Sequence, residues 1–577
     1  MQVSREDVVW FQSRVKGINW EWVLLGLTVG FVVYLVISPL WMLIYSSFRT
    51  VGPGDPGPFT FANYIEAYLS ANTYELLLNT ALFTLISLAV GLSIGVFFAW
   101  LVERTNTPLR NVAFALIPLT MAMPSMLYGI AWLLLLSPRV GVINLILMHL
   151  FKLEAAPINP NSIVGMGLVE GLRLASSIFL MVVGVFRSMD PSLEEAAFTS
   201  GADIPTTMRR VTFRLMLPGI LAAAIYSCTT AFDAFEIPAV LGMPRGIHVF
   251  ATKIYLASHE IPPNYGMAST LGVFLVALAV LWVYLYGRAT RHSEAYATVT
   301  GKGYRSRVLD LGKWKYGGTA LFFTHFAVVV IAPLSILVWG SLLPYYQVPS
   351  TEALSKLSLD SYRKILNSPW LLDALKNTLM VVLTAPALAI IISSIIAWII
   401  VRTRFRGRRI LDAFAFLPHA IPGIVLSLSF LWVYLKLTFI PIYGTVWIIA
   451  LAFVARHMAY GTRSMNSAML QIHKELDEAA YASGASWLTT FSRITIPLLL
   501  PSLTAVWIWS AMHTIRDMTL PIMLYSPDSR VLAVFIWDLW LSGEVPATCA
   551  IGVMLLIILA VLLFVGRIVV MRRTRQS

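Results

Sequence analysis

The sequence predicts an all-α, polytopic membrane protein of about twelve transmembrane helices, arranged as two homologous six-helix halves. Three observations lead to this fold class: an apolar composition, long apolar runs that recur along the chain, and an internal repeat. Of the 577 residues, 58% are hydrophobic and only 12% are charged, and the mean hydropathy is +0.76. A chain this apolar is unlike a water-soluble protein, so we expect it in a lipid bilayer.

The apolar runs have the length of membrane-spanning helices. A helix needs roughly 20 residues to cross ~30 Å of hydrocarbon. Runs near that length include Trp22–Ile44, Thr80–Val102, Gly317–Trp339 and Thr548–Val565. Strands of a membrane barrel would be about 10 residues long and would alternate apolar with polar residues. These runs are apolar on every face, so they predict helices.

Positive charge is concentrated in alternate loops. The net charge is +13, and basic residues gather in segments 288–315, 402–409 and 567–575. Loops rich in lysine and arginine face the cytoplasm, which predicts that both termini are cytoplasmic and that the number of spans is even. The same distribution argues for a bilayer, and not nucleic acid, as the partner of these charges. The only two cysteines, Cys228 and Cys549, lie in apolar surroundings and are expected to be packing residues.

The two halves of the chain repeat one another. Asn79-Thr80 recurs as Asn377-Thr378, at an offset of 298 (377 − 79 = 298), and Glu195-Ala196-Ala197 recurs as Glu478-Ala479-Ala480, at an offset of 283 (478 − 195 = 283). The change of offset falls in a longer first-half loop, 137–160, which we expect to be extracytoplasmic. Since both copies begin and end on one side, we expect an axis along the membrane normal to relate them.

The repeat and the loop charges define the predicted domains. Charged residues precede the first run with no small-residue cleavage site behind it, so this span is expected to be retained. The predicted divisions are a cytoplasmic N-terminal segment 1–20, a first half 21–287, a cytoplasmic linker 288–316, a second half 317–569 and a cytoplasmic tail 570–577.

A short polar segment between the fourth and fifth spans recurs in both halves, at 190–201 and 474–484. Asp190 is a suitable helix N-cap, Pro191 suits the first helical position, and acidic residues follow in the first turn. Gly201 and Gly484 can end the helices in the left-handed conformation. A second short helix is expected from Asp203 or Ser486. An interfacial helix-turn-helix would explain one such segment, but two at matching places favour a docking surface for another protein.

These segments resemble the Glu-Ala-Ala loop of permeases in binding-protein-dependent ABC importers of the type I fold. The family pattern is Glu-Ala-Ala, three residues, Gly, nine residues and Ile-x-Leu-Pro. The second copy matches it with Ile494-Thr495-Ile496-Pro497, whereas the first has Arg214 where proline is expected and keeps only Pro218. Because of this departure at Arg214, the sequence does not determine how the chain enters the fifth span.

The resemblance implies partners, location and substrate class. Each loop would dock one of two copies of an ABC ATPase subunit in a bacterial inner membrane, and an extracytoplasmic solute-binding protein would deliver the solute. The layout is most similar to ferric-iron-type permeases, with organophosphate, polyamine and thiamine-like solutes as open alternatives. The docking residues carried over from the family are Glu195, Ala196, Ala197, Gly201, Glu478, Ala479, Ala480 and Gly484.

The sequence contains no motif for ATP hydrolysis. No Gly-x-x-x-x-Gly-Lys-Ser/Thr phosphate loop occurs, so we predict a transport subunit that is not an enzyme, with ATP hydrolysed by a partner and no cofactor of its own. The histidines show no metal-ligand spacing, and a metal site stays unknown. A secondary transporter is the rival class, although it would have no reason to repeat a docking loop.

Ionisable residues within spans are candidates for function because each costs about 2.5–3.5 kcal/mol at mid-helix. Glu170 and Arg173 are expected to neutralise one another on one helix face. At the second offset, Asp233 aligns with Arg516 (233 + 283 = 516). Two interpretations stay open for these spans: a lining that handles a charged solute, or a structural Asp233–Arg516 bridge between the halves. The candidate pathway residues are Asp233, Glu236, His513, Arg516 and Asp517.

Overall fold

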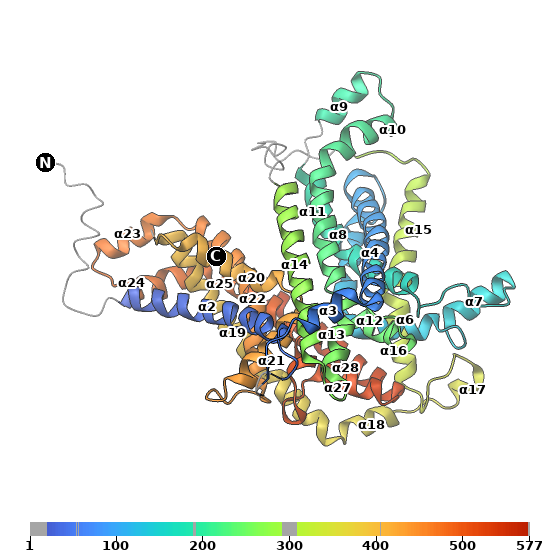
Figure 1. Ribbon diagram of the computed structural model, residues 1–577. Helices are drawn as coiled ribbons and strands as arrows, with labels where there is room; N and C mark the ends of the chain where they lie inside the picture. The colour runs from blue at the N-terminus through green and yellow to red at the C-terminus, as the bar shows by residue number, and fades with distance from the viewer. Residues whose placement is uncertain are drawn as a thin grey trace.

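The computed structural model describes residues 20–52, 55, 57–188, 192–290, 308–403 and 405–574 (Figure 1). Within these ranges all regular elements are helices, which confirms the all-α prediction. Asp190 and Pro191, most of the linker, Arg404, the first nineteen residues and the last three lie outside the described residues, so the expectations placed on them are not addressed by the structure.

The first half contains six spans in chain order. They are α2 (Trp20–Ser47), α4 (Ala71–Arg104), the broken pair of α5 with η2 (Arg110–Leu116, Ile117–Ala122) and α6 (Ser125–Leu136), α8 (Ile163–Ser188), η3 with α11 (Met208–Thr212, Phe213–Phe232) and α14 (Tyr265–Thr290). Shorter helices join them: α3 (Ala62–Leu69), α7 (Val142–Phe151), α9 (Ser192–Thr199), α10 (Ile204–Thr207), α12 (Glu236–Leu241), η4 (Met243–Arg245) and α13 (Phe250–His259).

The second half repeats this order. Its spans are α15, η6 and α16 in one run (Trp314–Phe326, Ala327–Ile331, Ala332–Ser341), α19 (Pro369–Arg402), α20 with α21 (Arg408–Ala420, Gly423–Lys436), α22 (Val446–Gln471), η7 with α25 (Phe491–Thr495, Ile496–Arg516) and α28 (Val545–Thr574). Its shorter helices are α17 (Thr351–Leu354), α18 (Asp360–Leu366), α23 (Lys474–Ala482), α24 (Trp487–Thr490), α26 (Pro521–Leu524), η8 (Pro527–Ser529) and α27 (Leu532–Leu541).

The span count agrees with the prediction once α22 is included. In the described residues nine helices are long and apolar enough to cross a membrane, or up to eleven if each broken pair is one span. Helix α22 is not among them because residues such as Arg456, His457 and Arg463 lower its hydropathy. It nevertheless occupies the place of α8, since α22 packs along α19 as α8 packs along α4.

The third span of each half is broken at a proline. The helix axes turn by 97° between η2 and α6 and by 107° between α20 and α21. Pro124 and Pro422 follow the breaks, and the preceding residues, Met123 and Ile421, are extended, as the residue before proline prefers. Each break leaves carbonyl groups at one helix end and N–H groups at the next without intrahelical partners. Such groups need polar partners within a membrane protein.

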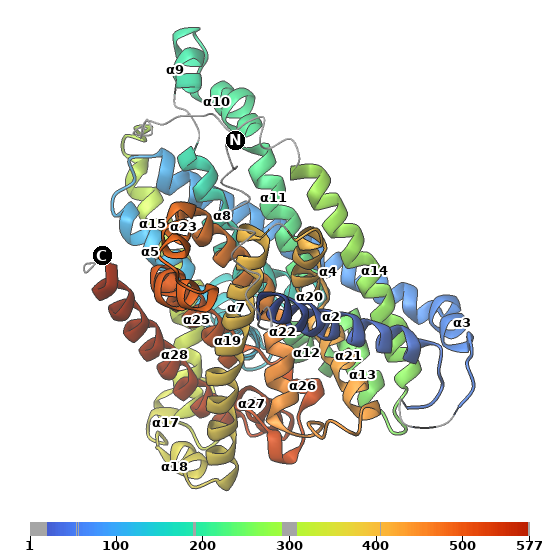
Figure 2. The ribbon, with the colours of Figure 1, turned by 90° about the vertical axis from the view of Figure 1, so that its left-hand side faces the viewer.

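The first span of each half packs against the opposite half. Val32 and Val36 of α2 lie in the core that contains Trp398 and Met458 of the second half. Phe322 of α15 lies in the core of the first half. Figures 1 and 2 show α2 running beside second-half helices, and α15 lies beside α4 and α5 of the first half. The two halves are therefore interlocked through their first spans as well as through their facing surfaces.

The end of the linker is bound to the first half. Leu309 pairs with the loop after α4, where its N–H donates to the carbonyl of Arg104 at 2.8 Å and its carbonyl accepts from Asn106 N–H at 3.0 Å. The second half thus begins from a point fixed on the first.

Candidate functional site: docking helices and facing breaks

The two Glu-Ala-Ala segments form matching short helices, α9 and α23, as predicted. Gly201 and Gly484 end them with φ of +85° and +82°, in the left-handed region. In each case the next N–H, of Ala202 or Ala485, reaches back five residues to a helix carbonyl at 3.0 Å. This is a Schellman ending, which glycine permits because it has no Cβ.

The chain then restarts in both halves. Asp203 accepts a hydrogen bond from Thr206 N–H at 3.1 Å before α10, and Ser486 accepts from Thr489 N–H at 3.3 Å before α24. Hydrogen bonds from the side chain and backbone of Thr206 hold the pKa of Asp203 below its ordinary value. Both expected second helices are confirmed, although each is only one turn long.

The path into the fifth span is the same in both halves, despite Arg214. A single π-helical turn, η3 or η7, joins the short helix to the span, and the two turns stand at equivalent positions. Arg214 lies in the first turn of α11 and leaves the helix intact, while Pro218 and Pro501 lie inside the spans.

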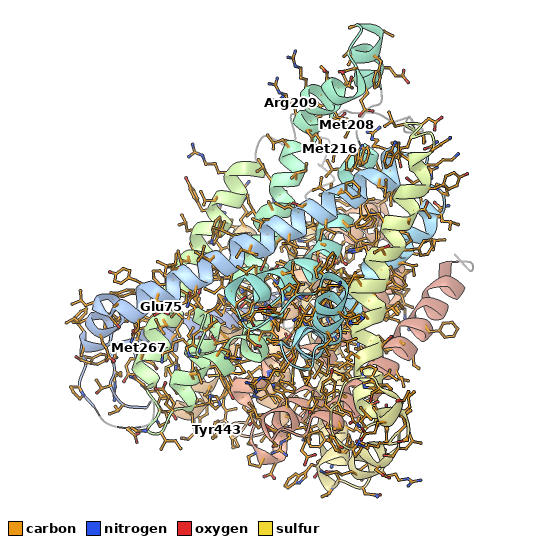
Figure 3. All side chains as sticks on the ribbon, turned by 90° about the vertical axis from the view of Figure 1, so that its right-hand side faces the viewer. Glu75, Met208, Arg209, Met216, Met267 and Tyr443 are labelled. Atoms are coloured by element: carbon orange, nitrogen blue, oxygen red, sulfur yellow. The ribbon has the colours of Figure 1, made fainter. Side chains whose placement is uncertain are left out.

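Much of the motif surface on α9 and α23 is exposed, although Ala197 is half-buried and Ala480 is buried. Glu195, Ala196, Glu478 and Ala479 are all exposed, whereas the acid before each glutamate is turned inward. Figures 1 and 2 show α9 and α10 projecting from one end of the molecule. In Figure 3, Met208 and Arg209 mark this end and Glu75 marks the opposite end of the same half. The described arrangement leaves both motif surfaces open to a second protein.

The predicted pathway residues lie where the halves meet, at the breaks in the third spans. Asp233, which follows α11, accepts a hydrogen bond from Gly423 N–H at 2.8 Å, and its other oxygen is 2.9 Å from Nη2 of Arg456. The guanidinium of Arg456 also donates to the carbonyl of Ile421 at 2.8 Å. A carboxylate of the first half therefore satisfies the open N-terminus of α21 in the second half.

Arg516, at the end of α25, makes the reciprocal contact. Its guanidinium donates to the carbonyl of Met121 in η2 of the first half and also contacts the ring of His513. A cation here faces the carbonyl end of a helix, and the anion Asp233 faces an N–H end, so each charge meets the helix pole that favours it. Of the two interpretations left open by the sequence, the structural Asp233–Arg516 bridge is wrong, because each of the two residues reaches the opposite half's break instead of the other residue.

The remaining candidates lie close to this contact. Glu236 accepts from Met518 N–H at 2.9 Å across the interface and is 7% exposed. Asp517 accepts from Thr519 N–H at 2.7 Å within its own loop. His513 contacts the carbonyl of Trp509 at 2.9 Å. We call Asp233, Glu236, Arg456, Arg516 and Asp517 the break cluster.

Arg456 is the member that sequence reasoning missed. It was hidden by the polar character of α22, but the internal repeat marks its position, because Arg173 aligns with it at the second offset (173 + 283 = 456). The predicted pairing of Arg173 with Glu170 is confirmed, with Nε of Arg173 donating to the glutamate at 3.1 Å. Equivalent arginines thus pair within the half in one case and across the halves in the other.

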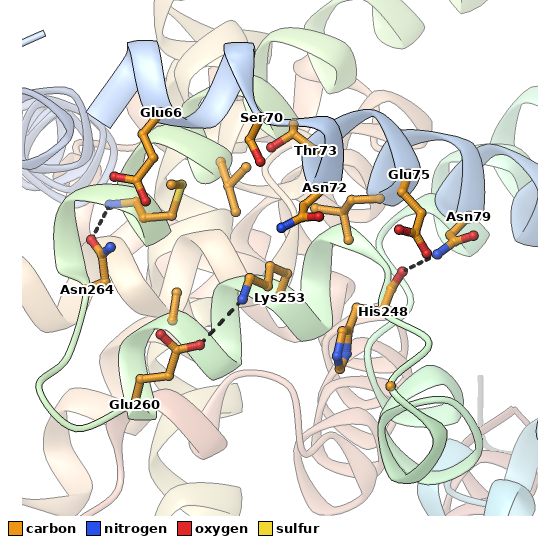
Figure 4. A pocket seen from close by; sticks show the side chains of 15 residues that line it. Glu66, Ser70, Asn72, Thr73, Glu75, Asn79, His248, Lys253, Glu260 and Asn264 are labelled. Atoms are coloured by element: carbon orange, nitrogen blue, oxygen red, sulfur yellow. Dashed lines mark hydrogen bonds and ion pairs between the residues drawn. The ribbon is translucent and has the colours of Figure 1, made fainter. Parts of the chain in front are cut away.

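A separate cavity of about 390 Å³ lies at the opposite end of the first half from α9 (Figure 4). Glu66, Glu75, Glu260, Lys253 and His248 line it, and Lys253 is 3.4 Å from Glu260. Burial and the neighbouring Lys253 lower the pKa of His248. All its lining residues belong to the first half, so it is distinct from the contact between the halves. Among the described residues, no group of three or more His, Cys, Asp or Glu is placed to hold a metal ion.

Two interlocked halves, an exposed Glu-Ala-Ala helix in each half and charges at their facing breaks are typical of a membrane transport protein of the permease class. The chain belongs to the family of binding-protein-dependent transport system inner membrane components, whose model matches residues 91–292 and 370–573.

Curated relatives include the ferric transport system permease protein FbpB of Actinobacillus pleuropneumoniae, 28% identical over 408 residues, and the putative ferric transport system permease protein FbpB 1 of Haemophilus influenzae, 28% identical over 377. The matches cover 70% and 64% of this chain and 58% of each relative. The chain therefore spans less than two thirds of the length of these relatives. The Fe(3+)-transport system permease protein FbpB 2 of Haemophilus influenzae is 22% identical, with 85% of this chain and 89% of the relative covered.

Proposed function

We propose that this chain is the permease subunit of an ATP-binding-cassette importer and forms the whole membrane pathway from its two fused halves. The observation that carries the proposal is the pair of exposed Glu-Ala-Ala helices, α9 and α23, built alike in both halves of a chain that has no phosphate-binding loop. Two equivalent surfaces suit two copies of one ATPase subunit, each of which would hydrolyse ATP for the permease.

The orientation follows from the same surfaces. The α9 and α23 end would face the cytoplasm of a bacterial inner membrane, together with both termini, and the basic loops agree with this orientation. The opposite end, with α7, α17 and α18, would receive an extracytoplasmic solute-binding protein. The predicted domain divisions at 20, 287, 316 and 569 fit this orientation and belong to the proposal.

The solute would pass between the halves, beside the break cluster. Asp233 and Arg456 join the halves there and still keep 19% and 21% of their side-chain surfaces exposed. Charges within a membrane normally face a protein interior or a water-filled cavity, and the contact between the halves provides both. Ferric iron is the proposed solute, supported by the names of the relatives and by three acidic side chains in the cluster.

The test is energy-dependent uptake of radioactive ferric iron by cells that express the chain, combined with purification of the tagged chain from their membranes. We expect an ATPase subunit, detected by photolabelling with azido-ATP, to copurify, and uptake to stop when ATP is depleted. Uptake that persists without ATP and follows the proton gradient would show a secondary transporter instead. Copurification of the ATPase without iron uptake would keep the importer and reject ferric iron, and native mass spectrometry of the binding protein that stimulates ATP hydrolysis would then identify the solute.

A further inference from the structure

A buried carboxylate lies behind the exposed face of α9. Glu194 is 8% exposed, and its two oxygens have different partners. One oxygen is 3.3 Å from Nη1 of Arg104, the last residue of α4, and the other accepts from the hydroxyl of Thr212 at 2.7 Å, just before α11. Arg104 also donates to the carbonyl of Phe186 at 3.2 Å, in the last turn of α8. One carboxylate and one guanidinium thus connect α9 to the ends of three spans.

The second half contains the same arrangement behind α23. Asp477 is 3.1 Å from Nε of Arg402, the last residue of α19, and accepts from the hydroxyl of Thr495 at 3.4 Å. Arg402 donates to the carbonyls of Met469 at 3.4 Å and Ile472 at 2.8 Å, at the end of α22. We call the two sets, Arg104–Glu194–Thr212 and Arg402–Asp477–Thr495, the carboxylate clamps.

The clamps occupy equivalent places. The arginines are related by the first offset (402 − 104 = 298), and the acids and threonines by the second (477 − 194 = 283, 495 − 212 = 283). Each arginine meets the carbonyl end of the fourth span, where a cation is favoured. The two arginine side chains are 4% and 6% exposed.

A buried ion pair is a poor source of stability, because removing both charges from water costs about as much as their attraction returns. The role of the ion pair here is to fix the orientation of the exposed helix relative to the spans. Without a fixed link to the spans, a push on the exposed helix could tilt the helix without moving a span. With the carboxylate fixed from two sides, the helix and the ends of three spans form one body.

We propose that the carboxylate clamps are the positioning residues that convert a displacement of each docking helix into movement of the fifth span. The fifth spans, α11 and α25, begin at the clamp threonines and end at Asp233 and Arg516, at the breaks of the opposite half. A movement imposed at the clamp is therefore delivered to the break cluster. The inference rests on the proposed docking role of α9 and α23 and adds the residues that transmit it.

The test uses variants that remove each clamp without leaving an unpaired buried charge: Arg104→Met with Glu194→Gln, and Arg402→Met with Asp477→Asn. The matched control is Glu103→Gln with Arg187→Gln, because that pair, 2.7 Å apart, joins the same α4 and α8 beside the clamp. Where a double variant does not insert, Thr212→Val and Thr495→Val remove only the hydroxyl contacts and should act in the same direction with smaller effect.

Two spin-label pairs report whether helix and span move together. One pair is Ser200→Cys with Leu217→Cys in α11, and its equivalent is Ser483→Cys with Leu500→Cys in α25; all four sites are exposed. The native cysteines are both buried and can be replaced by serine. Distances are measured by pulsed electron paramagnetic resonance in the complex copurified with its ATPase, with and without ATP and vanadate.

For the parent chain and for the Glu103→Gln, Arg187→Gln control, we expect each distance distribution to be narrow and the same with and without ATP and vanadate. The clamp variants should give a broadened distance that shifts with ATP and vanadate. They should also lower iron uptake by about tenfold, within the range of about 5- to 150-fold typical of coupling between distant sites, while ATPase retention and basal ATP hydrolysis stay at the parent level.

Unchanged narrow distances in the clamp variants would overturn the proposal, as would an equal loss of uptake in the control. Loss of ATPase retention in step with uptake would also overturn it, since the clamps would then serve only to hold the fold. If the parent chain retains no ATPase, the proposed function fails as well, and this outcome is distinct from a failure of the clamps alone.

Discussion

The two halves agree at the Glu-Ala-Ala helices, the proposed docking surfaces, and differ where they meet in the membrane. At the docking end, the Glu-Ala-Ala helix, its glycine ending, the π-helical turn and the carboxylate clamp are the same in both. At the breaks, aspartate in one half stands where arginine stands in the other, and the equivalent arginines Arg173 and Arg456 choose different partners.

This difference indicates which constraint acts on each region. Two copies of one ATPase subunit, as proposed, would need two equal surfaces, which agrees with the symmetry of the Glu-Ala-Ala helices. A charged solute that crosses between the halves would contact both linings at once. Two identical linings would always carry the same charges, whereas two different linings can each carry the charge the solute requires. Variants in the Glu-Ala-Ala helices and in the break cluster should therefore have different effects.

The largest effect is expected from breaking the two arginine pairs. Glu170→Gln should cost about 3–5 kcal/mol of stability, because Glu170 is 1% exposed and a charge is left buried without its partner. Asp233→Asn should cost about 2–3 kcal/mol, less than loss of a fully buried pair, because the side chains of Asp233 and Arg456 are each about a fifth exposed. Thermal unfolding in detergent measures both changes.

The same two variants separate contacts within a half from contacts across the halves. When residues 1–300 and 301–577 are expressed as separate chains, Asp233→Asn should weaken their copurification and Glu170→Gln should leave it intact. Equal weakening by both variants would contradict the cross-half role of Asp233.

The next effect concerns the symmetric end. Gly201→Val with Gly484→Val should strain each helix ending by about 1–3 kcal/mol, because valine resists the left-handed conformation, and the ATPase should no longer copurify. Gly184→Val is the matched control: its added side chain meets open space, and its backbone φ is not in the left-handed region. Normal ATPase retention and normal stimulated hydrolysis in the double variant would remove α9 and α23 from docking.

A smaller, charge-specific effect is expected at the breaks. Glu236→Gln preserves the acceptor for Met518 N–H and removes only the charge, so for ferric iron it should slow uptake by on the order of tenfold, or ~1.4 kcal/mol. Arg516→Gln should do less harm. For an anionic solute such as an organophosphate the order should reverse, and uptake unaffected by either change would exclude both residues from the pathway.

The smallest effect is expected from cutting the linker. Coexpressed fragments 1–300 and 301–577 should restore uptake, since the cut lies outside the bonds between Leu309 and the loop after α4. A second fragment that begins at Trp314 should restore less, because it lacks this attachment. Failure of the first pair despite stable insertion of both fragments would show that the covalent connection itself is required.

The sequence by itself determined the features that depend on local pattern. Apolar run length predicts the spans, capping chemistry predicts α9 and α23, and the repeat predicts two equivalent halves. The glycine endings, the short second helices and the Glu170–Arg173 pair were all predictable because each involves residues fewer than about eight positions apart, within reach of one or two helical turns.

Only the tertiary structure decided which distant residues meet. Alignment at the second offset placed Asp233 opposite Arg516, but residues related by a two-fold arrangement touch only if they lie at its axis. In the structure, each of these two residues reaches the broken span of the opposite half. Arg456, the exchange of the first spans and the attachment of Leu309 likewise depend on packing between segments far apart in the chain. Hydropathy and periodicity carry no information about such contacts, because they record which face of a helix is buried and not what it is buried against.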